Sequence, residues 1–185
     1  MPPNDDASLW LAARDGDRDA FAALFDRHAP ALYRFAARLL SDGRDAEDAV
    51  QDVLLSVWQH NGFDPSRGEL RPYLLGAVRN QARKRAHQPD AELPEYAAGS
   101  EPAPDRKIAI AQTSRAVTEA IHELPWGQRE VLLLFHYEDL SLKEIGEALD
   151  LDLSAVKSRL HRARETLRAR LHSYALQPQP EGKDK

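Results

Sequence analysis

An acidic, proline-rich stretch in the middle of the chain constrains the fold more than any other feature. Residues 89–105 hold four prolines, five carboxylates and no lysine or arginine. Proline fixes its backbone angle and removes a hydrogen-bond donor, and the apolar residues here follow no regular period. Such a stretch is typical of a tether that lets its flanking domains lie tens of ångströms apart. The predicted division is a domain at 1–88, an acidic linker at 89–107, a domain at 108–174 and a disordered tail at 175–185.

Composition excludes several classes of protein and site. The chain has no cysteine, which rules out disulfides, thiolate metal sites and cysteine nucleophiles. Its seven histidines share no ligand spacing and it lacks a phosphate-binding glycine loop, so we predict no enzymatic activity, no metal and no other cofactor. No apolar run approaches the roughly 20 residues of a membrane span, and the N-terminus is polar and acidic. These features predict a cytoplasmic protein without membrane insertion.

The N-terminal half predicts amphipathic helices. A stripe from Phe21 to Leu39 contains Pro30, which we expect to kink that helix or end it. From Asp45 to Trp58 apolar residues recur every three or four positions, the clearest helical period in the chain. The opposite face is acidic, which is typical both of a solvated surface and of a surface for a basic partner. Its polar residues are Glu47, Asp48, Gln51 and Asp52.

A further predicted helix, from Pro72 to about His87, ends in a basic cluster. Cations at this end complement the helix dipole, and they equally form an edge that binds phosphate. Phe63, Tyr73 and Trp58 would be a platform for unpaired bases, although Trp58 also belongs to the apolar stripe. The candidate nucleic-acid residues of this helix are Arg79, Asn80, Arg83, Lys84 and Arg85.

The C-terminal half predicts a helix-turn-helix. Helical periods cover residues 108–124 and about 128–137, and Ser141 and Glu144 are spaced as a capping box that opens another helix. After a short connection, Ser154 is the expected N-cap of the final helix. Two helices joined by so tight a turn are typical of DNA-binding domains.

The final predicted helix divides into two faces at 100° per residue. Its apolar residues, Val156, Leu160, Ala163, Leu167 and Leu171, fall on one side and predict a core. Lys157, Ser158, His161 and Arg162 lie away from that stripe, and residues 156–172 carry a net charge of +5. Side chains near the start of such a helix reach base edges in the major groove, and later cations meet phosphates.

Two blocks of the sequence resemble conserved regions of bacterial RNA polymerase sigma factors of the extracytoplasmic-function class, in the sigma-70 family. Residues 45–58, which read DAEDAVQDVLLSVW, are similar to region two, and residues 124–134 and 156–164 are similar to region four. The resemblance covers nearly the whole chain, with both blocks in the family's order across a linker. It implies a two-domain, all-α protein that binds core RNA polymerase and directs promoter recognition and transcription initiation.

The resemblance also implies a role for each surface. The acidic helix would bind the β′ clamp helices of polymerase through Asp48, Gln51 and Asp52, and the second domain would meet the β flap. Residues 61–69 and the basic helix would contact the minus-ten element. Arg159 would be a structural residue or a phosphate contact, and an anti-sigma factor is a further implied partner. The residues implied to face the minus-thirty-five element are Lys157, Ser158, His161 and Arg162.

Three positions depart from the family pattern. Tyr73 stands where the family usually has Trp, and Lys84 stands where it often has Asp. Asp150 stands at a turn where small residues are usual, a change that Asp tolerates because it adopts unusual turn conformations readily. The sequence therefore predicts no particular promoter.

The residues alone leave other functions open. A stand-alone dimeric helix-turn-helix regulator would need no acidic helix face and would bind a palindrome by itself. An interaction scaffold would use both basic patches for acidic proteins and would ignore DNA. The acidic linker is equally consistent with a mimic of nucleic-acid charge and with a plain solubilising tether.

Overall fold

The computed structural model describes residues 5–40, 42–86 and 115–176, with side chains as far as residue 172. Within these ranges the chain is helical and has no strand, which confirms the predicted all-α fold. The predicted linker, the tail from 177 on and the first residues of the helix predicted at 108–124 lie outside them. No helix in the described ranges is both long and apolar enough to cross a bilayer.

The helices of the N-terminal half enclose an apolar core in which Leu32, Phe35 and Leu75 are fully buried. The first of them was not predicted, because its nine residues span too few turns to show a period. It begins at a sequence-local cap, where the Asp5 carboxylate accepts from the Ser8 amide at 2.8 Å. The helices are α1 (Asp6–Arg14), α2 (Arg18–Leu39), α3 (Gly43–Gln59) and α4 (Leu70–Ala86).

Helix α2 continues through Pro30, so the proline does not end it. Proline inside a helix removes one backbone hydrogen bond at a cost of about 3 kcal/mol. Leu24 and Phe35, on either side of Pro30, are both buried in the same core. Tertiary packing therefore holds the two parts of α2 together across the proline.

The predicted apolar stripe of α3 is confirmed, since its residues pack into the core. The helix begins one turn earlier than the stripe, because the Asp42 carboxylate accepts from the Arg44 amide at 2.7 Å and caps it. The buried residues of α3 are Ala46, Ala49, Val50, Val53, Leu54 and Val57.

The C-terminal half contains a helical segment at 115–122, then α6 (Trp126–His136), α7 (Leu142–Leu149) and α8 (Leu153–Leu176). The predicted capping box opens α7. The Glu144 amide donates to Ser141 Oγ at 3.2 Å, and the Ser141 amide donates to Glu144 Oε2 at 2.7 Å.

The predicted N-cap of the final helix is wrong by two residues. Ser154 lies inside α8, and the Asp152 carboxylate accepts from the Ala155 amide at 2.8 Å instead. Asp caps helices as well as Ser does, and Asp152 is the residue directly before α8.

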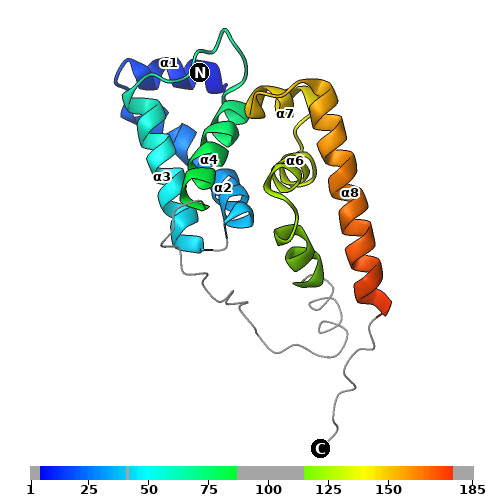
Figure 1. Ribbon diagram of the computed structural model, residues 1–185. Coiled ribbons are helices and arrows are strands. Elements are labelled where there is room, and N and C mark those ends of the chain that lie inside the picture. The colour runs from blue at the N-terminus through cyan, green and yellow to red at the C-terminus, as the bar shows by residue number, and fades with distance from the viewer. Residues whose placement is uncertain (1–4, 41, 87–114, 177–185) are drawn as a thin grey trace, which may run out of the picture.

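The two halves lie side by side, with α7 against α4 and α6 against α2 (Figure 1). Buried apolar residues of both halves belong to one continuous cluster. The Arg129 side chain of α6 also reaches across and donates to the Leu39 carbonyl at 3.0 Å. The tethered, separable halves expected from the sequence are therefore packed together here.

Candidate nucleic-acid and partner interfaces

Helix α8 presents a polar face opposite its buried stripe, as predicted. Val156, Leu160 and Ala163 are buried against α6 and α7. The predicted base-facing residues Lys157, Ser158, His161 and Arg162 are all exposed, within the first three turns of the helix. The arrangement leaves this face free to enter a groove of DNA.

A left-handed residue sets the angle between α7 and α8. Asp150 has φ 53° and ψ 53°, and it ends α7 with its amide donating to the Gly146 carbonyl. The Leu151 amide donates to the same carbonyl at 2.9 Å. A Cβ on Gly146 would lie 2.7 Å from the Leu151 carbonyl oxygen, so only glycine fits this close turn. The unusual Asp150 conformation expected from the sequence is thereby confirmed.

Arg159 differs from the other predicted DNA residues of α8. Its Nη1 atom lies 3.0 Å from Oε1 of Glu130, a fully buried carboxylate of α6. The pair ties the middle of α8 to α6 within the same half. Arg159 is thus only half-exposed and holds α8 in place, in keeping with the structural role that the resemblance implied.

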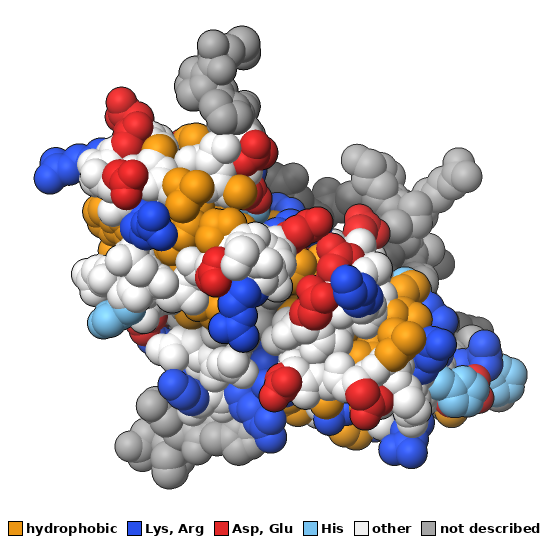
Figure 2. Space-filling model, turned by 90° about the horizontal axis from the view of Figure 1, so that it is seen from above, with side chains coloured by type: hydrophobic (Ala, Val, Ile, Leu, Met, Phe, Trp, Pro, Cys, Tyr) orange, Lys and Arg blue, Asp and Glu red, His pale blue; other side chains and the backbone are white. Residues whose placement is uncertain are grey.

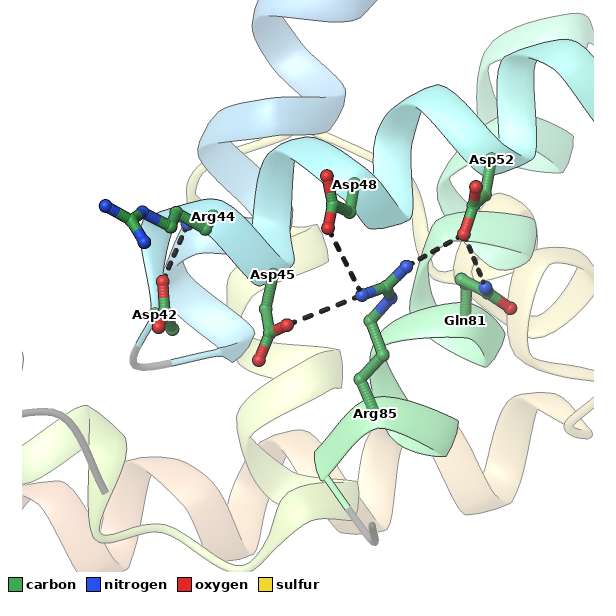
Figure 3. Close-up of polar contacts among 7 residues, drawn as sticks. All are labelled: Asp42, Arg44, Asp45, Asp48, Asp52, Gln81 and Arg85. Atoms are coloured by element: carbon green, nitrogen blue, oxygen red, sulfur yellow. Dashed lines mark hydrogen bonds and ion pairs between the residues drawn. The ribbon is translucent and has the colours of Figure 1, made fainter. Parts of the chain in front are cut away.

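The acidic face of α3 meets the basic end of α4. The Arg85 guanidinium lies 2.8 Å from Asp52, 3.4 Å from Asp45 and 3.7 Å from Asp48 (Figure 3). Gln81 also donates to Asp52 at 3.1 Å. Predicted polymerase residues and a predicted DNA residue therefore form one cluster.

The aspartates of this cluster keep a large part of their surface in solvent, 63% for Asp48 and 53% for Asp52. The predicted partner residue Gln51 is also exposed beside them. Leu55 lies one turn further along α3 and is 47% exposed. Leu55 was not predicted as a surface residue of interest, although an apolar residue outside a regular stripe is a detectable signal.

The remaining candidates on α4 fall into two groups. Asn80, Arg83 and Lys84 are exposed. Arg79 is 12% exposed and pairs with Glu130 of the other half. Its Nε donates to Glu130 Oε2 at 2.6 Å, and its Nη2 donates to Glu130 Oε1 at 3.0 Å. Its third nitrogen, Nη1, donates to the Asn80 side chain at 2.8 Å.

The three predicted stacking aromatics do not form one platform. Phe63 is buried, packs edge-on against Trp10 and contacts Tyr73 with ring centroids 5.3 Å apart. Trp58 instead stacks on Phe21 at 4.2 Å, in a separate aromatic group. Tyr73 is 37% exposed, and burial of the rest of its ring raises the pKa of the Tyr73 hydroxyl.

Charges of both signs are interspersed over the face seen in Figure 2, without one dominant basic patch. DNA affinity depends mainly on the number of cations that meet phosphates. This face therefore offers DNA phosphates no continuous row of cations.

Three histidines of the described residues are harder to protonate than a free imidazole, because their pKa is lowered. Burial lowers the pKa of His28, His122 and His136 below the ordinary histidine value. Within the described ranges, no three side chains of His, Asp or Glu are grouped so that they could hold a metal ion.

Comparisons with known proteins agree with this geometry. The family model described as Sigma-70 region 2 matches residues 24–88, and that described as Sigma-70, region 4 matches residues 114–167. The chain is 31% identical to the ECF RNA polymerase sigma factor SigW of Bacillus subtilis, over 85% of this chain and 92% of SigW. It is 32% identical to the RNA polymerase sigma factor CnrH of Cupriavidus metallidurans, over 92% of this chain and 97% of CnrH.

Two solved structures share the arrangement of helices. CnrH in complex with the cytosolic domain of CnrY gives a TM-score of 0.70 at 28% identity, over 91% of this chain and 97% of CnrH. The sigma factor RpoE in complex with the anti-sigma factor NepR, from Bartonella quintana, gives 0.64 at 27% identity, over 82% of this chain and 96% of RpoE.

Proposed function

Because this chain belongs to the extracytoplasmic-function class of the sigma-70 family, we propose that α3 and α8 carry the two contacts of a sigma factor. The protein binds core RNA polymerase and directs promoter recognition and transcription initiation. We assign residues 1–88 to the region-two domain and residues 108–174 to the region-four domain. The observation that supports these assignments most directly is the exposed polar face at the start of α8, which follows the tight turn after α7.

Region four reads the minus-thirty-five element with α8. Lys157, Ser158, His161 and Arg162 face base edges, where one good bidentate contact contributes about 1–3 kcal/mol of discrimination. Arg159 holds α8 against α6 through Glu130, so its role is to position the reading face. The same half contacts the β flap of polymerase.

Region two binds the β′ clamp helices with the exposed face of α3. Asp48, Gln51 and Asp52 supply polar and charged contacts, and Leu55 supplies an apolar one. Protein interfaces combine such a desolvated apolar contact with a polar rim. Arg85 of α4 pairs with Asp48 and Asp52 and fixes their side chains, which makes Arg85 a positioning residue for this surface.

Residues 61–69 and α4 contact the minus-ten element. Asn80, Arg83 and Lys84 are exposed and lie along one stretch of α4. Cations there hold the strand backbone, and bases unstack at a cost of only a few kcal/mol. Catalysis stays with polymerase, and the site of action is the cytoplasm.

An anti-sigma factor is a further proposed partner. The similar sigma factors CnrH and RpoE are solved in complex with CnrY and with the anti-sigma factor NepR. An inhibitor that covers the α3 face would compete with the clamp helices. The exposed Leu55 offers such a protein an apolar anchor.

Two assays test these assignments, one of binding to core polymerase and one of promoter-specific transcription. The purified chain should co-elute with sigma-free core polymerase on a sizing column. The double substitution Gln51→Ala with Asp52→Ala should weaken this association by about tenfold, since a few interface residues carry most of the binding energy. Arg162→Ala should leave core binding unchanged and lower promoter-specific transcription by about tenfold, the loss of one base contact.

Matched controls separate these roles from general charge effects. Asp26→Ala removes an exposed carboxylate of α2 outside the α3 face, and Arg170→Ala removes a cation of α8 that pairs with Glu123. Both should behave like the wild type. Failure of the chain to bind core, together with tight binding of a palindrome by the free chain, would support a stand-alone regulator instead.

A further inference from the structure

One arginine of α8 belongs neither to the buried stripe nor to the residues assigned to base edges. Arg164 is exposed on the flank of α8 that contacts the end of α6, and the two helices run side by side (Figure 1). On an ideal helix Arg164 lies within about 60° of Lys157 and His161, which are also exposed. Arg164 therefore borders the face assigned to the minus-thirty-five element.

Two side chains at the end of α6 hold the Arg164 guanidinium. Its Cζ atom lies over the Phe135 ring, 5.1 Å from the ring centre. Its Nη2 atom lies 3.2 Å from Nε2 of His136. A guanidinium can only donate hydrogen bonds, so Nε2 of His136 is the acceptor and its ring is neutral in this contact.

The surroundings of His136 favour this neutral form. Burial lowers the pKa of His136, and the positive charge of Arg164 lowers that pKa further. Phe135 packs against the apolar core, which fixes the ring on which the guanidinium lies. Arg164 is thus ordered by one aromatic ring and one neutral acceptor.

No carboxylate compensates the charge of Arg164 within the described residues. Three other arginines of α8 differ, because Arg159, Arg168 and Arg170 each pair with a glutamate. Across the same residues the Nε and Nη1 atoms of Arg164 have no hydrogen-bond partner. A guanidinium has five N–H donors, so most of them are left for a ligand.

An ordered guanidinium without a carboxylate partner is suited to a phosphate group. Arginine binds phosphate through two parallel hydrogen bonds. In a recognition helix the residues near its start meet base edges, and later cations meet phosphates. A side chain that is already ordered also loses less rotamer freedom when it binds. A glutamate in place of His136 would compete with the phosphate, whereas a neutral acceptor does not.

We propose that Arg164 binds a backbone phosphate at the edge of the groove that α8 enters, and that His136 is its positioning residue. The inference rests on the proposed role of α8 at the minus-thirty-five element. The contact adds affinity for duplex DNA of any sequence, whereas Arg162 discriminates between sequences. Phe135 supports the guanidinium from the core side.

The salt dependence of DNA binding tests the phosphate contact. In duplex DNA the logarithm of the association constant falls with the logarithm of the salt concentration, with a slope of about −0.9 for each phosphate neutralised. The full chain is titrated with short fluorescent duplexes of two unrelated sequences. Arg164→Ala should reduce the slope by about one on both duplexes and weaken binding by about tenfold at low salt.

Two variants of His136 test its positioning role. His136→Gln keeps an acceptor oxygen close to the position of Nε2 and should bind duplex DNA like the wild type. His136→Phe keeps a ring but removes the acceptor, and should weaken binding by about threefold because Arg164 must then be ordered on binding. Arg170→Ala is the matched control, since it removes a cation of the same helix that pairs with Glu123. It should keep the wild-type slope.

Each outcome bears on one part of the inference. An unchanged slope in Arg164→Ala, with wild-type helical circular dichroism, would overturn the phosphate contact. An effect of Arg164→Ala on only one of the two duplexes would also overturn it, because it would indicate a base contact. Equal binding by His136→Gln and His136→Phe would overturn the positioning role. Loss of core association in the wild type would overturn the proposed function instead, since none of these titrations contains polymerase.

Discussion

Asp150 determines how α8 leaves α7. Its φ of 53° lies in the left-handed region, which costs most L-residues roughly 1–2 kcal/mol and costs Asp and Gly less. We expect Asp150→Val to lower the free energy of unfolding by about 1–2 kcal/mol, and Asp150→Gly to be tolerated. Chemical unfolding followed by helical circular dichroism would measure both. A stable Asp150→Val variant would show that the turn can rearrange without its left-handed residue.

His28 gives the N-terminal half a dependence on pH. It is 4% exposed, its Nε2 lies 2.8 Å from Asp6, and Arg27 and Arg71 also face it. Burial lowers the pKa of His28 more than Asp6 raises it. A group with a lowered folded pKa stabilises the protein above its unfolded value of about 6.5, and this stabilisation is lost as pH falls through the folded pKa.

We therefore expect the free energy of unfolding to decrease from about pH 7 to about pH 5, and His28→Asn to flatten this decrease. Urea unfolding at several pH values, followed by tryptophan fluorescence, measures the slope. His60→Asn, at an exposed histidine of the same half, is the control and should keep the wild-type slope. An equally steep slope in His28→Asn would assign the effect to another group.

The basic cluster of α4 was predictable from the sequence, but the partner of each of its residues was not. The run from Arg79 to Arg85 predicted one phosphate-binding edge. In the structure Arg79 binds Glu130, Arg85 binds the α3 aspartates, and Arg83 and Lys84 are exposed. Helical rotation separates neighbours in the run, and the acidic partners of Arg79 and Arg85 lie 33 or more residues away, so composition alone could not assign them.

At the scale of elements, regular periods were predicted well and irregular signals were not. The α3 stripe from Ala46 to Val57 is buried as expected, and so are Val156, Leu160 and Ala163 of α8, because a 3.6-residue period predicts a core on one side. Leu167 and Leu171 of the predicted α8 stripe are only half-buried. Helix α1 was missed, the N-cap of α8 fell on Asp152, and α2 continued through Pro30. The continuation of α2 depends on packing against other elements, which a local pattern does not contain. Helix α1 is instead too short to show a period, and the cap of α8 is a local hydrogen bond to Asp152.

Helix α1 should depend on one anchor. Trp10 is 3% exposed and packs edge-on against Phe63 at 5.7 Å, while Trp58 donates to the Ala13 carbonyl at 3.3 Å. We expect Trp10→Ala to lower the free energy of unfolding by about 3–5 kcal/mol through the cavity it leaves. Leu11→Ala, at a 41% exposed neighbour, should change it by less than about 0.5 kcal/mol. Urea unfolding followed by circular dichroism compares them, and equal effects would show that α1 is not anchored by Trp10.

At the scale of the whole molecule, the two domains were predictable but their packing was not. Proline and charge marked the boundary between them in the sequence. The contacts that join them, such as Arg71 with Glu138 and Gly76 with Ala148, connect residues on opposite sides of that boundary. No local pattern relates such pairs, and a glycine inside a helix does not indicate which backbone carbonyl of another helix it will contact.

The packing of the halves should depend on the tether. Association of two separate molecules costs about 4–15 kcal/mol in lost translational and rotational freedom. A tether lowers this cost, because it holds the two halves at a millimolar effective concentration. We expect a protease site inserted within 89–107 to release the halves on cleavage, so that they elute separately at micromolar concentration. Uncleaved chain is the control and elutes as one species. Co-elution of the cleaved halves would mean that their interface holds without the tether.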